Sequence, residues 1–507
     1  MIQAIDHVAL LPVYLAGGTA VLALVADLVL ARPRVTVAVA ALGAAAVTVA
    51  AWAVGTGGVR ETFCLLADPG ACSYVADRTA AVVAVLFGLL TLGVLGLSTG
   101  AVRRLPAGEY TFLLAASMTG GVALAYSRDL ITLIVALETL TLPLYALVGL
   151  RRRSLASAYG AMTFFVVSVV ATSVTLLGAA LLYASTGAVH LGRIADVLSG
   201  GVPAPLLTLA TVGVVLVLAG LAFKVAAVPF HAWAPVAYDG APVPVAAYLS
   251  TASKLGGVVA VLYVVVLALR PWLDVAGVPL AALAIATMTV GNLVALRQRR
   301  MVRLLAWSSV AQAGYLLAPL GGFAVASGRT DEALVLAVTA TVAYTVFYVL
   351  MELAAFGAVV ALRGGGADGG EIEDYRGAAR RARWTGAAFT LALVGLAGLP
   401  PGLAGMFAKV AVVRSLLGGG AGWLALIVAV NAVVGLAYYL RVAAVLYSPA
   451  PSPSPSLSPV PARAGLGTVP WAVGAALGVA TAVAVVVGFA PQLVLDAAQT
   501  ALTTLAP

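Results

Sequence analysis

Long apolar runs are the feature that most constrains this sequence. Of its 507 residues, 63% are hydrophobic and 9% are charged, which leaves too little polar surface to cover a water-soluble particle of this size. Runs of about twenty apolar residues recur along the chain, and each is long enough to cross a bilayer as a helix. The sequence therefore predicts an all-α polytopic membrane protein.

About fourteen such spans are predicted, separated by charge clusters, proline or glycine. The first has no basic segment before it and no small-residue cleavage site after it, so we expect it to be retained. The predicted spans lie near residues 8–30, 35–54, 78–100, 110–127, 129–150, 155–183, 205–227, 243–269, 276–296, 304–324, 333–362, 385–417, 422–447 and 469–490.

Arginines are distributed unequally between alternate loops. Seventeen fall in one set of loops and six in the other. The positive-inside rule assigns the richer set to the cytoplasm and predicts both termini on the outer side of the membrane. These arginines also explain the net charge of +9, so nucleic acid is not an expected partner. The excess of arginine over lysine, with abundant Ala, Gly and Val, favours the plasma membrane of a bacterium with a GC-rich genome.

The chain contains three lysines, Lys224, Lys254 and Lys409, and each lies in or beside an apolar span. A lysine at the bilayer centre costs roughly 2.5–3.5 kcal/mol on insertion scales. An ammonium with little water around it can release and rebind a proton. Glu138, near the middle of the span 129–150, is a carboxylate that needs a partner or a proton there. Together the four residues predict a proton relay, and the alternative is a set of structural ion pairs.

Proline interrupts two of the predicted spans. The stretch FKVAAVPFHAWAPVAYDGAPVP begins at Phe223, and GLAGLPPGLAGMFAK carries Pro400 and Pro401 before Lys409. We therefore expect the seventh and twelfth spans to be broken helices that line a polar cavity. The two lie five spans apart and so run in opposite directions, as an inverted repeat requires.

Three loop features complete the pattern. Cys64 and Cys72 are expected on the outer side, where disulfides persist, and we predict a bridge between them. Two cysteines cannot ligate an iron–sulfur cluster unaided and no dinucleotide-binding pattern is present, so no cofactor is expected in this chain.

Residues 448–464 are predicted to form an extended proline-rich linker, and residues 364–383 a solvated connector, with a docking element as the alternative.

Four stretches resemble the antiporter-like membrane subunits of respiratory complex I: LETLTLPLYALVGL, FKVAAVPFHAWAPVAYDGAPVPVAAYLSTASK, RLLAWSSVAQAGYLL and LAGLPPGLAGMFAK. The resemblance implies an enzyme subunit that translocates protons, with other complex I membrane subunits, the bilayer and protons as partners. Flavin, iron–sulfur clusters and quinone are expected in partner subunits. It also implies two inverted five-helix units, at 108–270 and 271–447. N-terminal helices at 1–107, a linker at 448–468 and a last helix within 469–507 complete the expected domains.

The resemblance also assigns roles to individual residues. Glu138 corresponds to the glutamate of the fifth helix, and Lys224 to its partner on the broken seventh helix. Lys254 corresponds to the central lysine and Lys409 to the terminal lysine on the broken twelfth helix. His231 matches the family's histidine after the first break.

The chain departs from the family pattern at two positions. Gln312 stands where related subunits often carry a histidine, and an amide cannot titrate near neutral pH. Glu352 stands where a small or amide residue is expected. It is predicted to form a structural pair with Arg441, and the alternative is an added proton-carrying group.

Other functions fit parts of the same pattern. A subunit of a multisubunit sodium/proton antiporter would use an ion gradient in place of redox energy. Membrane-bound hydrogenases and formate-oxidising complexes have related subunits, and a passive scaffold with inert lysines is a further alternative. Neighbouring genes for flavin and iron–sulfur subunits would favour complex I over the antiporter.

Overall fold

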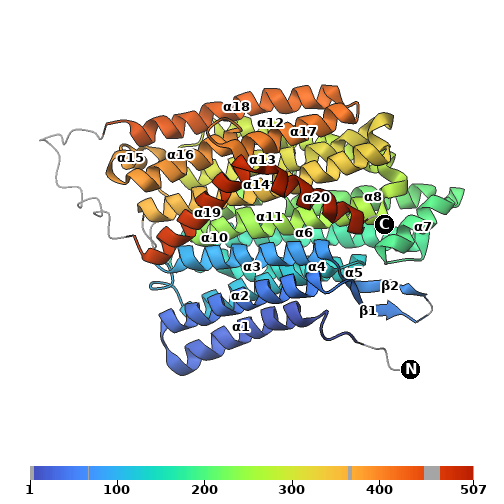
Figure 1. Cartoon of the computed structure of the whole chain (residues 1–507), viewed down its shortest axis with the longest axis horizontal. Coiled ribbons are helices and arrows are strands. Elements are labelled where there is room, and N and C mark those ends of the chain that lie inside the picture. Colours follow the sequence, from blue (N-terminus) through green and yellow to red (C-terminus); the bar gives the residue numbers. More distant parts are fainter. Residues whose placement is uncertain (1–4, 67, 364–367, 450–468, 506–507) are drawn as a thin grey trace, which may run out of the picture.

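The computed structural model describes residues 5–66, 68–363, 368–449 and 469–505. Most of them lie in helices that run side by side along one common direction, with a small β-hairpin at one end (Figure 1). The elements are α1 (Leu11–Leu30), α2 (Pro33–Thr56), β1 (Arg60–Leu65), β2 (Asp68–Ala76), α3 (Arg78–Ser98), α4 (Ala107–Tyr126), α5 (Leu130–Val148), α6 (Leu155–Thr186), α7 (Leu191–Gly200), α8 (Ala204–Lys224), α9 (Trp233–Gly240), α10 (Val243–Tyr248), α11 (Lys254–Tyr263), α12 (Leu273–Ala295), α13 (Met301–Gly321), α14 (Asp331–Arg363), α15 (Ala378–Arg381), α16 (Arg383–Ala397), α17 (Leu403–Gly418), α18 (Gly422–Tyr447), α19 (Trp471–Phe489) and α20 (Pro491–Leu505).

Eleven helices in the described part of the chain are long and apolar enough to cross a membrane. One of them, Val243–Ala268, joins α10 to α11 through one π-helical segment, Leu249–Ser253, and ends in a second, Val264–Ala268. The others are α1, α2, α3, α5, α6, α8, α12, α14, α18 and α19. The chain is therefore an all-α polytopic membrane protein, as the sequence predicts.

The other three predicted spans also correspond to helices. The prediction near 110–127 falls on α4 and that near 304–324 on α13, whose inner face carries Ser308, Ser309 and Gln312. The prediction near 385–417 falls on two shorter helices, α16 and α17. That these helices bring the number of crossings to fourteen stays a prediction.

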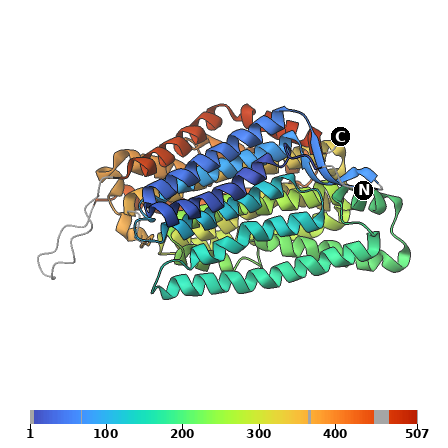
Figure 2. The same cartoon turned by 90° about the horizontal axis from the view of Figure 1, so that it is seen from below.

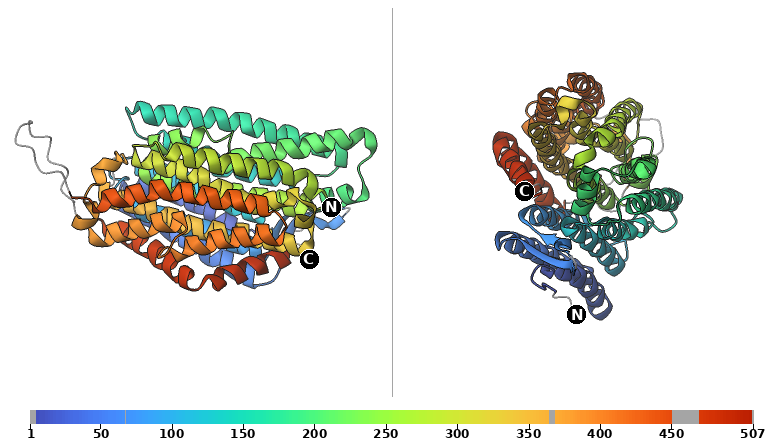
Figure 3. Two further views of the ribbon diagram at one scale, coloured as in Figure 1. Left: turned by 90° about the horizontal axis from the view of Figure 1, so that it is seen from above. Right: turned by 90° about the vertical axis from the view of Figure 1, so that its right-hand side faces the viewer.

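The bundle is elongated, with α1 and α2 at one edge (Figure 3). Helix α6 lies along an outer flank, where it exposes apolar side chains such as Leu155, Tyr159 and Met162 (Figure 2). The C-terminal helices α19 and α20 pack against α3 and α14. The sequence predicts only one helix there, and α20 is an addition to it.

Helices α12 and α13 touch through their backbones. A Cβ atom on Gly291 would lie 2.5 Å from the backbone nitrogen of Ala311, and one on Gly314 would lie 2.6 Å from that of Met288. Small residues allow such close approach, and helices in membranes associate largely through this kind of packing. Side chains larger than that of glycine at Gly291 or Gly314 would therefore not fit in the α12–α13 contact.

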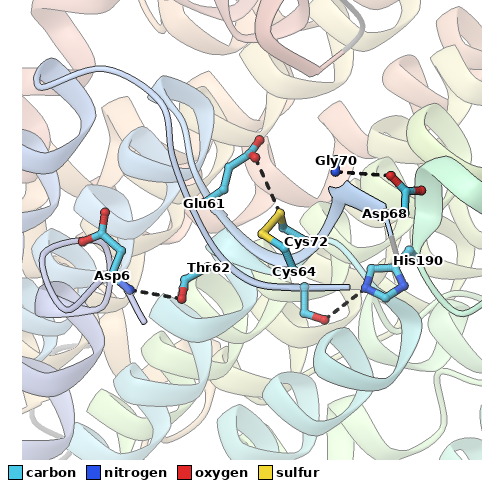
Figure 4. Close-up of a disulfide and its surroundings, with 9 residues drawn as sticks. Asp6, Glu61, Thr62, Cys64, Asp68, Gly70, Cys72 and His190 are labelled. Carbon is cyan, nitrogen blue, oxygen red and sulfur yellow. Dashed lines mark hydrogen bonds between the residues drawn. A yellow bond between two sulfur atoms is a disulfide. The ribbon is translucent and has the colours of Figure 1, made fainter. Parts of the chain in front are cut away.

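The β-hairpin carries the predicted disulfide. Strands β1 and β2 are antiparallel, Cys64 lies opposite Cys72, and the two sulfurs are bonded (Figure 4). Arg60 forms an ion pair with Asp6, at 2.9 Å, and Ser73 forms a hydrogen bond of 3.3 Å with His190 at the start of α7. The hairpin is thus tied to the segment before α1 and to α7, and the disulfide prediction is confirmed.

The segment between α14 and α16 is docked on the bundle over the residues that the structure describes. The amide of Ile372 donates to the carbonyl of Arg299, at 2.8 Å, and the amide of Met301 donates to that of Gly370, at 2.9 Å. The side chain of Ile372 is buried. The prediction of a solvated connector is therefore wrong for this segment, because buried apolar side chains and backbone pairing hold it in place. The predicted proline-rich linker lies almost wholly outside the described residues.

An ion-pair network fixes the start of this docked segment. Arg300 contacts Asp368 at 3.0 Å and Asp239 at 2.8 Å, and Arg363 lies 3.7 Å from Asp368. Burial raises the pKa of Asp368. The hydrogen bond from Arg300 and the positive charges of Arg300, Arg363 and Arg151 outweigh this effect and hold the pKa below its ordinary value.

Candidate functional site

Glu138 and Lys224 form an ion pair between α5 and α8. The Lys224 ammonium donates to Glu138 Oε1 at 2.7 Å, to Thr141 Oγ1 at 3.1 Å and to Ser168 Oγ at 3.4 Å. Thr172 donates its hydroxyl to the same carboxylate oxygen at 2.6 Å. The lysine is buried and the Glu138 side chain is 23% exposed. All three ammonium hydrogens therefore have acceptors, of which only one is charged.

The position of Lys224 follows from the end of its helix. Helix α8 stops at this residue, and α9 begins only at Trp233. In between, Ala226 adopts a left-handed conformation with φ of 59°, and the Trp233 indole donates to the carbonyl of Phe223 at 3.2 Å. Four prolines between Pro229 and Pro244 are incompatible with one continuous helix over this stretch.

His231 lies in the segment between α8 and α9, away from the Glu138–Lys224 pair. Its ring packs against Trp307, with ring centroids 5.2 Å apart. Its Nδ1 atom is buried and has no hydrogen-bond partner among the described residues, and the same holds for Trp307 Nε1. The structure therefore places His231 at a separate position of the candidate site.

Lys254 is held by neutral oxygens. It is the first residue of α11, and its ammonium donates to the carbonyl and to Oγ of Ser309, the latter at 2.6 Å. Tyr348 forms a hydrogen bond of 2.8 Å with the same Ser309 hydroxyl and donates to the carbonyl of Ser250 at 2.9 Å. No described carboxylate lies within ion-pair distance of Lys254.

Gln312 connects three helices. Its amide nitrogen donates to the carbonyl of Leu396 at 3.0 Å and to the Tyr439 hydroxyl at 3.1 Å. Its amide oxygen accepts from the Tyr344 hydroxyl at 2.5 Å. Tyr439 also bonds to Ser308, one residue before the Ser309 that holds Lys254. Gln312 therefore lies in a polar cluster that begins beside Lys254 and reaches the end of α16.

Lys409 binds the end of α16. Its ammonium donates to the carbonyl of Ala397, the last residue of that helix, at 2.6 Å and lies 4.9 Å from the centre of the Tyr315 ring. Carbonyls at a helix C-terminus lack intrahelical partners and attract cations. The next residue, Gly398, has φ of 84°, and a Cβ atom there would lie 2.6 Å from Lys409 Cδ. Gln312 and Lys409 thus bind consecutive carbonyls, those of Leu396 and Ala397.

Lys409 also lines a cavity of about 840 Å³. The cavity lies between α14, α17 and α18, and most of its walls are apolar side chains of α17 and α18. Gly398 lies at its edge, so the end of α16 and the Lys409 side chain open onto the same space. This arrangement gives the terminal lysine room to move.

Glu352 does not form the predicted pair. Arg441 lies on the exposed side of α18 and donates to the carbonyls of Leu296 and Gln298, each at 2.7 Å. Glu352 is fully buried in α14, and neither of its carboxylate oxygens has a hydrogen-bond partner among the described residues. The prediction of a Glu352–Arg441 pair is wrong, because exposed backbone carbonyls at the end of α12 satisfy the arginine.

Sequence reasoning missed the neutral groups around the lysines. Ser309, Tyr348 and Tyr439 are needed to hold Lys254 and Gln312, and Thr172 supports Glu138. One signal was available: Tyr344, Tyr348 and Glu352 recur every four residues in a helix that is otherwise apolar, which places three polar groups on one face.

The sequence and the fold match known proteins over almost the whole chain. Residues 127–435 match the family described as NADH:quinone oxidoreductase/Mrp antiporter, transmembrane region. The chain is 64% identical to NADH-quinone oxidoreductase subunit N of Salinispora tropica, over 98% of this chain and 99% of that protein. It is 46% identical to NADH-quinone oxidoreductase subunit N 2 of Streptomyces griseus, over 88% of this chain and 84% of that protein.

Solved structures agree with these relatives. A chain of respiratory complex I from Thermus thermophilus is similar with a TM-score of 0.77 at 29% identity, over 96% of this chain and 98% of that one. A chain of the Mrp complex from Dietzia sp. has a TM-score of 0.81 at 22% identity, over 98% and 97%, and shares the fold. The chain therefore belongs to the family of NADH-quinone oxidoreductase N subunits, the antiporter-like membrane subunits of respiratory complex I.

Proposed function

We propose that this subunit moves protons across the membrane through a relay of Glu138, Lys224, Lys254 and Lys409. The observation that carries the proposal is the Glu138–Lys224 ion pair, in which two titratable groups meet inside the bundle among neutral hydroxyls. Ionisable groups inside membrane-spanning segments are rare, and proton pathways are among the few functions that require them. NADH oxidation and quinone reduction in partner subunits, which hold the flavin and iron–sulfur clusters, drive the relay.

Glu138 acts as a switch on Lys224. While the carboxylate is close, its negative charge favours the ammonium form and Lys224 keeps its proton. When the carboxylate withdraws, burial of the lysine favours the neutral amine and the proton leaves. Thr141 and Ser168 remain as partners for the amine, so Lys224 is not left without hydrogen bonds in either state.

The proton then passes along water to Lys254 and on toward Lys409. Gln312 serves as a passive bridge between the two, and His231 and Glu352 support the path. The interruptions between α8 and α9 and between α16 and α17 are the breaks of two transmembrane helices. Irregular backbone at membrane depth is tolerated where it lines a polar path, which supports this assignment. Lys409 releases the proton to the outer side.

The proposed path implies an arrangement of the whole subunit. Residues 108–270 and 271–447 form two inverted five-helix units, and residues 1–107 and 469–507 flank them. The subunit lies in the bacterial plasma membrane with both termini outside, beside the other membrane subunits of complex I. The first and last described residues lie toward the same end of the bundle, which supports placing both termini on one side of the membrane (Figure 1).

Removing the lysines tests the relay. Replacing Lys224 or Lys409 by Met keeps an apolar side chain of similar length and removes the proton carrier. We expect proton pumping and coupled quinone reduction to fall about a hundredfold or more in assembled complex, the scale of a lost acid–base group. Replacement by Arg, which stays charged, is expected to impair pumping as well. Pumping is measured by a pH-sensitive dye in vesicles in sodium-free buffer.

Arg414→Met is the matched control, because it removes another cation from α17, and it should pump normally. Normal pumping in both Met variants at Lys224 and Lys409 would end the relay proposal. For Glu138, the switch requires that Gln be harmful and that Asp be partly tolerated. A Glu138→Gln variant with the activity of the parent would remove this residue from the mechanism.

A further inference from the structure

Glu352 is unusual among the buried carboxylates of this subunit. Asp77 is held by Arg128 and by the amide of Ala80, and Asp129 by the amide and hydroxyl of Thr132. Glu352 is 0% exposed, and neither oxygen has a donor among the described residues. A carboxylate kept only for structure is expected to have fixed donors, because burial without them is costly. Glu352 has none.

The surroundings of Glu352 contain one cation. Its carboxylate interacts electrostatically with Lys254, which does not form an ion pair with it. The other polar groups that interact with it are tyrosines: Tyr348 one turn earlier on α14, Tyr238 on α9 and Tyr439 on α18. The Tyr238 hydroxyl is also without a hydrogen-bond partner in the described structure. Among the described residues, Glu352 therefore interacts electrostatically with Lys254 and with tyrosines whose hydroxyls can accept or donate.

Gln312 cannot carry a proton between Lys254 and Lys409, and the neighbours of Glu352 lie on both sides of it. Lys254 and Tyr348 share Ser309, and Tyr439 binds Gln312, whose amide contacts the carbonyl beside the one that holds Lys409. An amide cannot take up a proton near neutral pH, whereas a carboxylate can. Glu352, one turn after Tyr348 on α14, is a carboxylate that interacts electrostatically with Lys254 and with Tyr439, one in each part of this polar cluster.

We propose that Glu352 is a further proton carrier, which exchanges a proton with Lys254 and passes it toward the Tyr439–Gln312 cluster and Lys409. In the first step an N–H bond of the Lys254 ammonium breaks, the hydroxyls of Ser309 and Tyr348 pass the proton on, and an O–H bond forms on Glu352, so that both groups become neutral. The Ser309 oxygens remain as partners for the amine. The inference rests on the proposed relay and names the group that replaces a titratable side chain at position 312.

The Glu352→Met variant distinguishes a proton-carrying role of Glu352 from a purely structural role. Methionine fills a similar volume and removes two unpaired oxygens, so the variant is expected to assemble at least as well as the parent. A carrier predicts that Glu352→Met and Glu352→Gln lower protons pumped per NADH oxidised, with the pumping rate down about tenfold, and that Glu352→Asp keeps part of it. Thr339→Val is the matched control, because it removes another unpartnered buried hydroxyl from α14 and should leave pumping unchanged.

Assembly is measured first, on the full complex by native gel, and pumping is expressed per assembled complex. Met and Gln variants that pump like the parent would overturn the inference. A Met variant that fails to assemble would also overturn it, because the carboxyl would then have a structural partner. Lys409→Met is measured alongside. If it is inactive while Glu352→Met is normal, only Glu352 is removed from the path, and if both are normal, the relay itself fails.

Discussion

At the residue scale, the three lysines are stabilised in different ways. The ammonium of Lys224 donates to a carboxylate, and that of Lys254 to a hydroxyl and a backbone carbonyl. The ammonium of Lys409 donates to a carbonyl at the end of a helix. A lysine held by neutral oxygens can lose its proton without leaving an unpaired anion behind. Only Lys224 requires a compensating change at its partner, which makes the Glu138–Lys224 pair the natural point of control.

Gly398→Ala tests the contact that holds Lys409. Alanine at φ of 84° is expected to cost roughly 1–2 kcal/mol, and its Cβ atom would displace the Lys409 side chain from Ala397. We expect a lower melting temperature of the assembled complex and slower pumping. Gly192→Ala, where a Cβ atom meets nothing within 4 Å, is the control and should be neutral. Unchanged melting and pumping in Gly398→Ala would show that the lysine can be held elsewhere.

Much of the site could be predicted, because an ionisable residue in an apolar run is visible in the sequence. Glu138 and the three lysines belong to this class, and the structure pairs Glu138 with Lys224. The partners of Lys254 and Lys409 could not be predicted, because backbone carbonyls and single hydroxyls carry no sequence signal. The partners of Arg441 could not be predicted either. Its guanidinium donates to the backbone carbonyls of Leu296 and Gln298 and does not pair with Glu352.

At the element scale, hydrophobic length predicts spans well and short elements poorly. Pro229 and Pro400 lie between helices in the structure, in line with the poor fit of proline in a helix interior. Hydrophobic length does not predict the hairpin, α7 or α20, because these elements are short or amphipathic and have no long apolar run. The polar composition of the docked segment after α14 conceals its buried apolar side chains, among them Ile372 and Tyr375, so the sequence does not predict docking.

The docked segment should loosen in acid. The pKa of Asp368 is lower in the folded protein than in the unfolded chain, so ionised Asp368 stabilises the docked state at every pH above about 4. This contribution is lost as the pH falls below that value and through the lower pKa of the folded state. Hydrogen exchange at the amides of Ile372 and Met301 measures it, and the protection factors of these amides, which correct for the intrinsic pH dependence of exchange, should fall in that range.

Asp368→Asn is the control for this pH dependence. It cannot ionise, so the protection factors of the same amides should already be lower at neutral pH, and their further fall in acid should be smaller. Equal pH dependence in the parent and in Asp368→Asn would assign the effect to other acids of the network, such as Asp239.

At the scale of the whole molecule, charge distribution predicts orientation. Single cysteines on opposite ends of the bundle test it, since the two native cysteines are bonded to each other. We expect Ser199→Cys, beside the hairpin end, to react with a membrane-impermeant maleimide added outside intact cells. Arg152→Cys, at the arginine-rich end, should react only after the membrane is permeabilised. The reverse pattern would invert the proposed topology and place the disulfide in the cytoplasm.

The backbone contact between α12 and α13 restricts how energy can travel through this subunit. A shift of one helix along the other would bring a Cβ atom against backbone at Gly291 or Gly314, so the pair cannot slide like a piston. Relative motion of α12 and α13 is then confined to their side chains. A signal that crosses the α12–α13 pair therefore travels as a redistribution of charge, from one titratable group to the next.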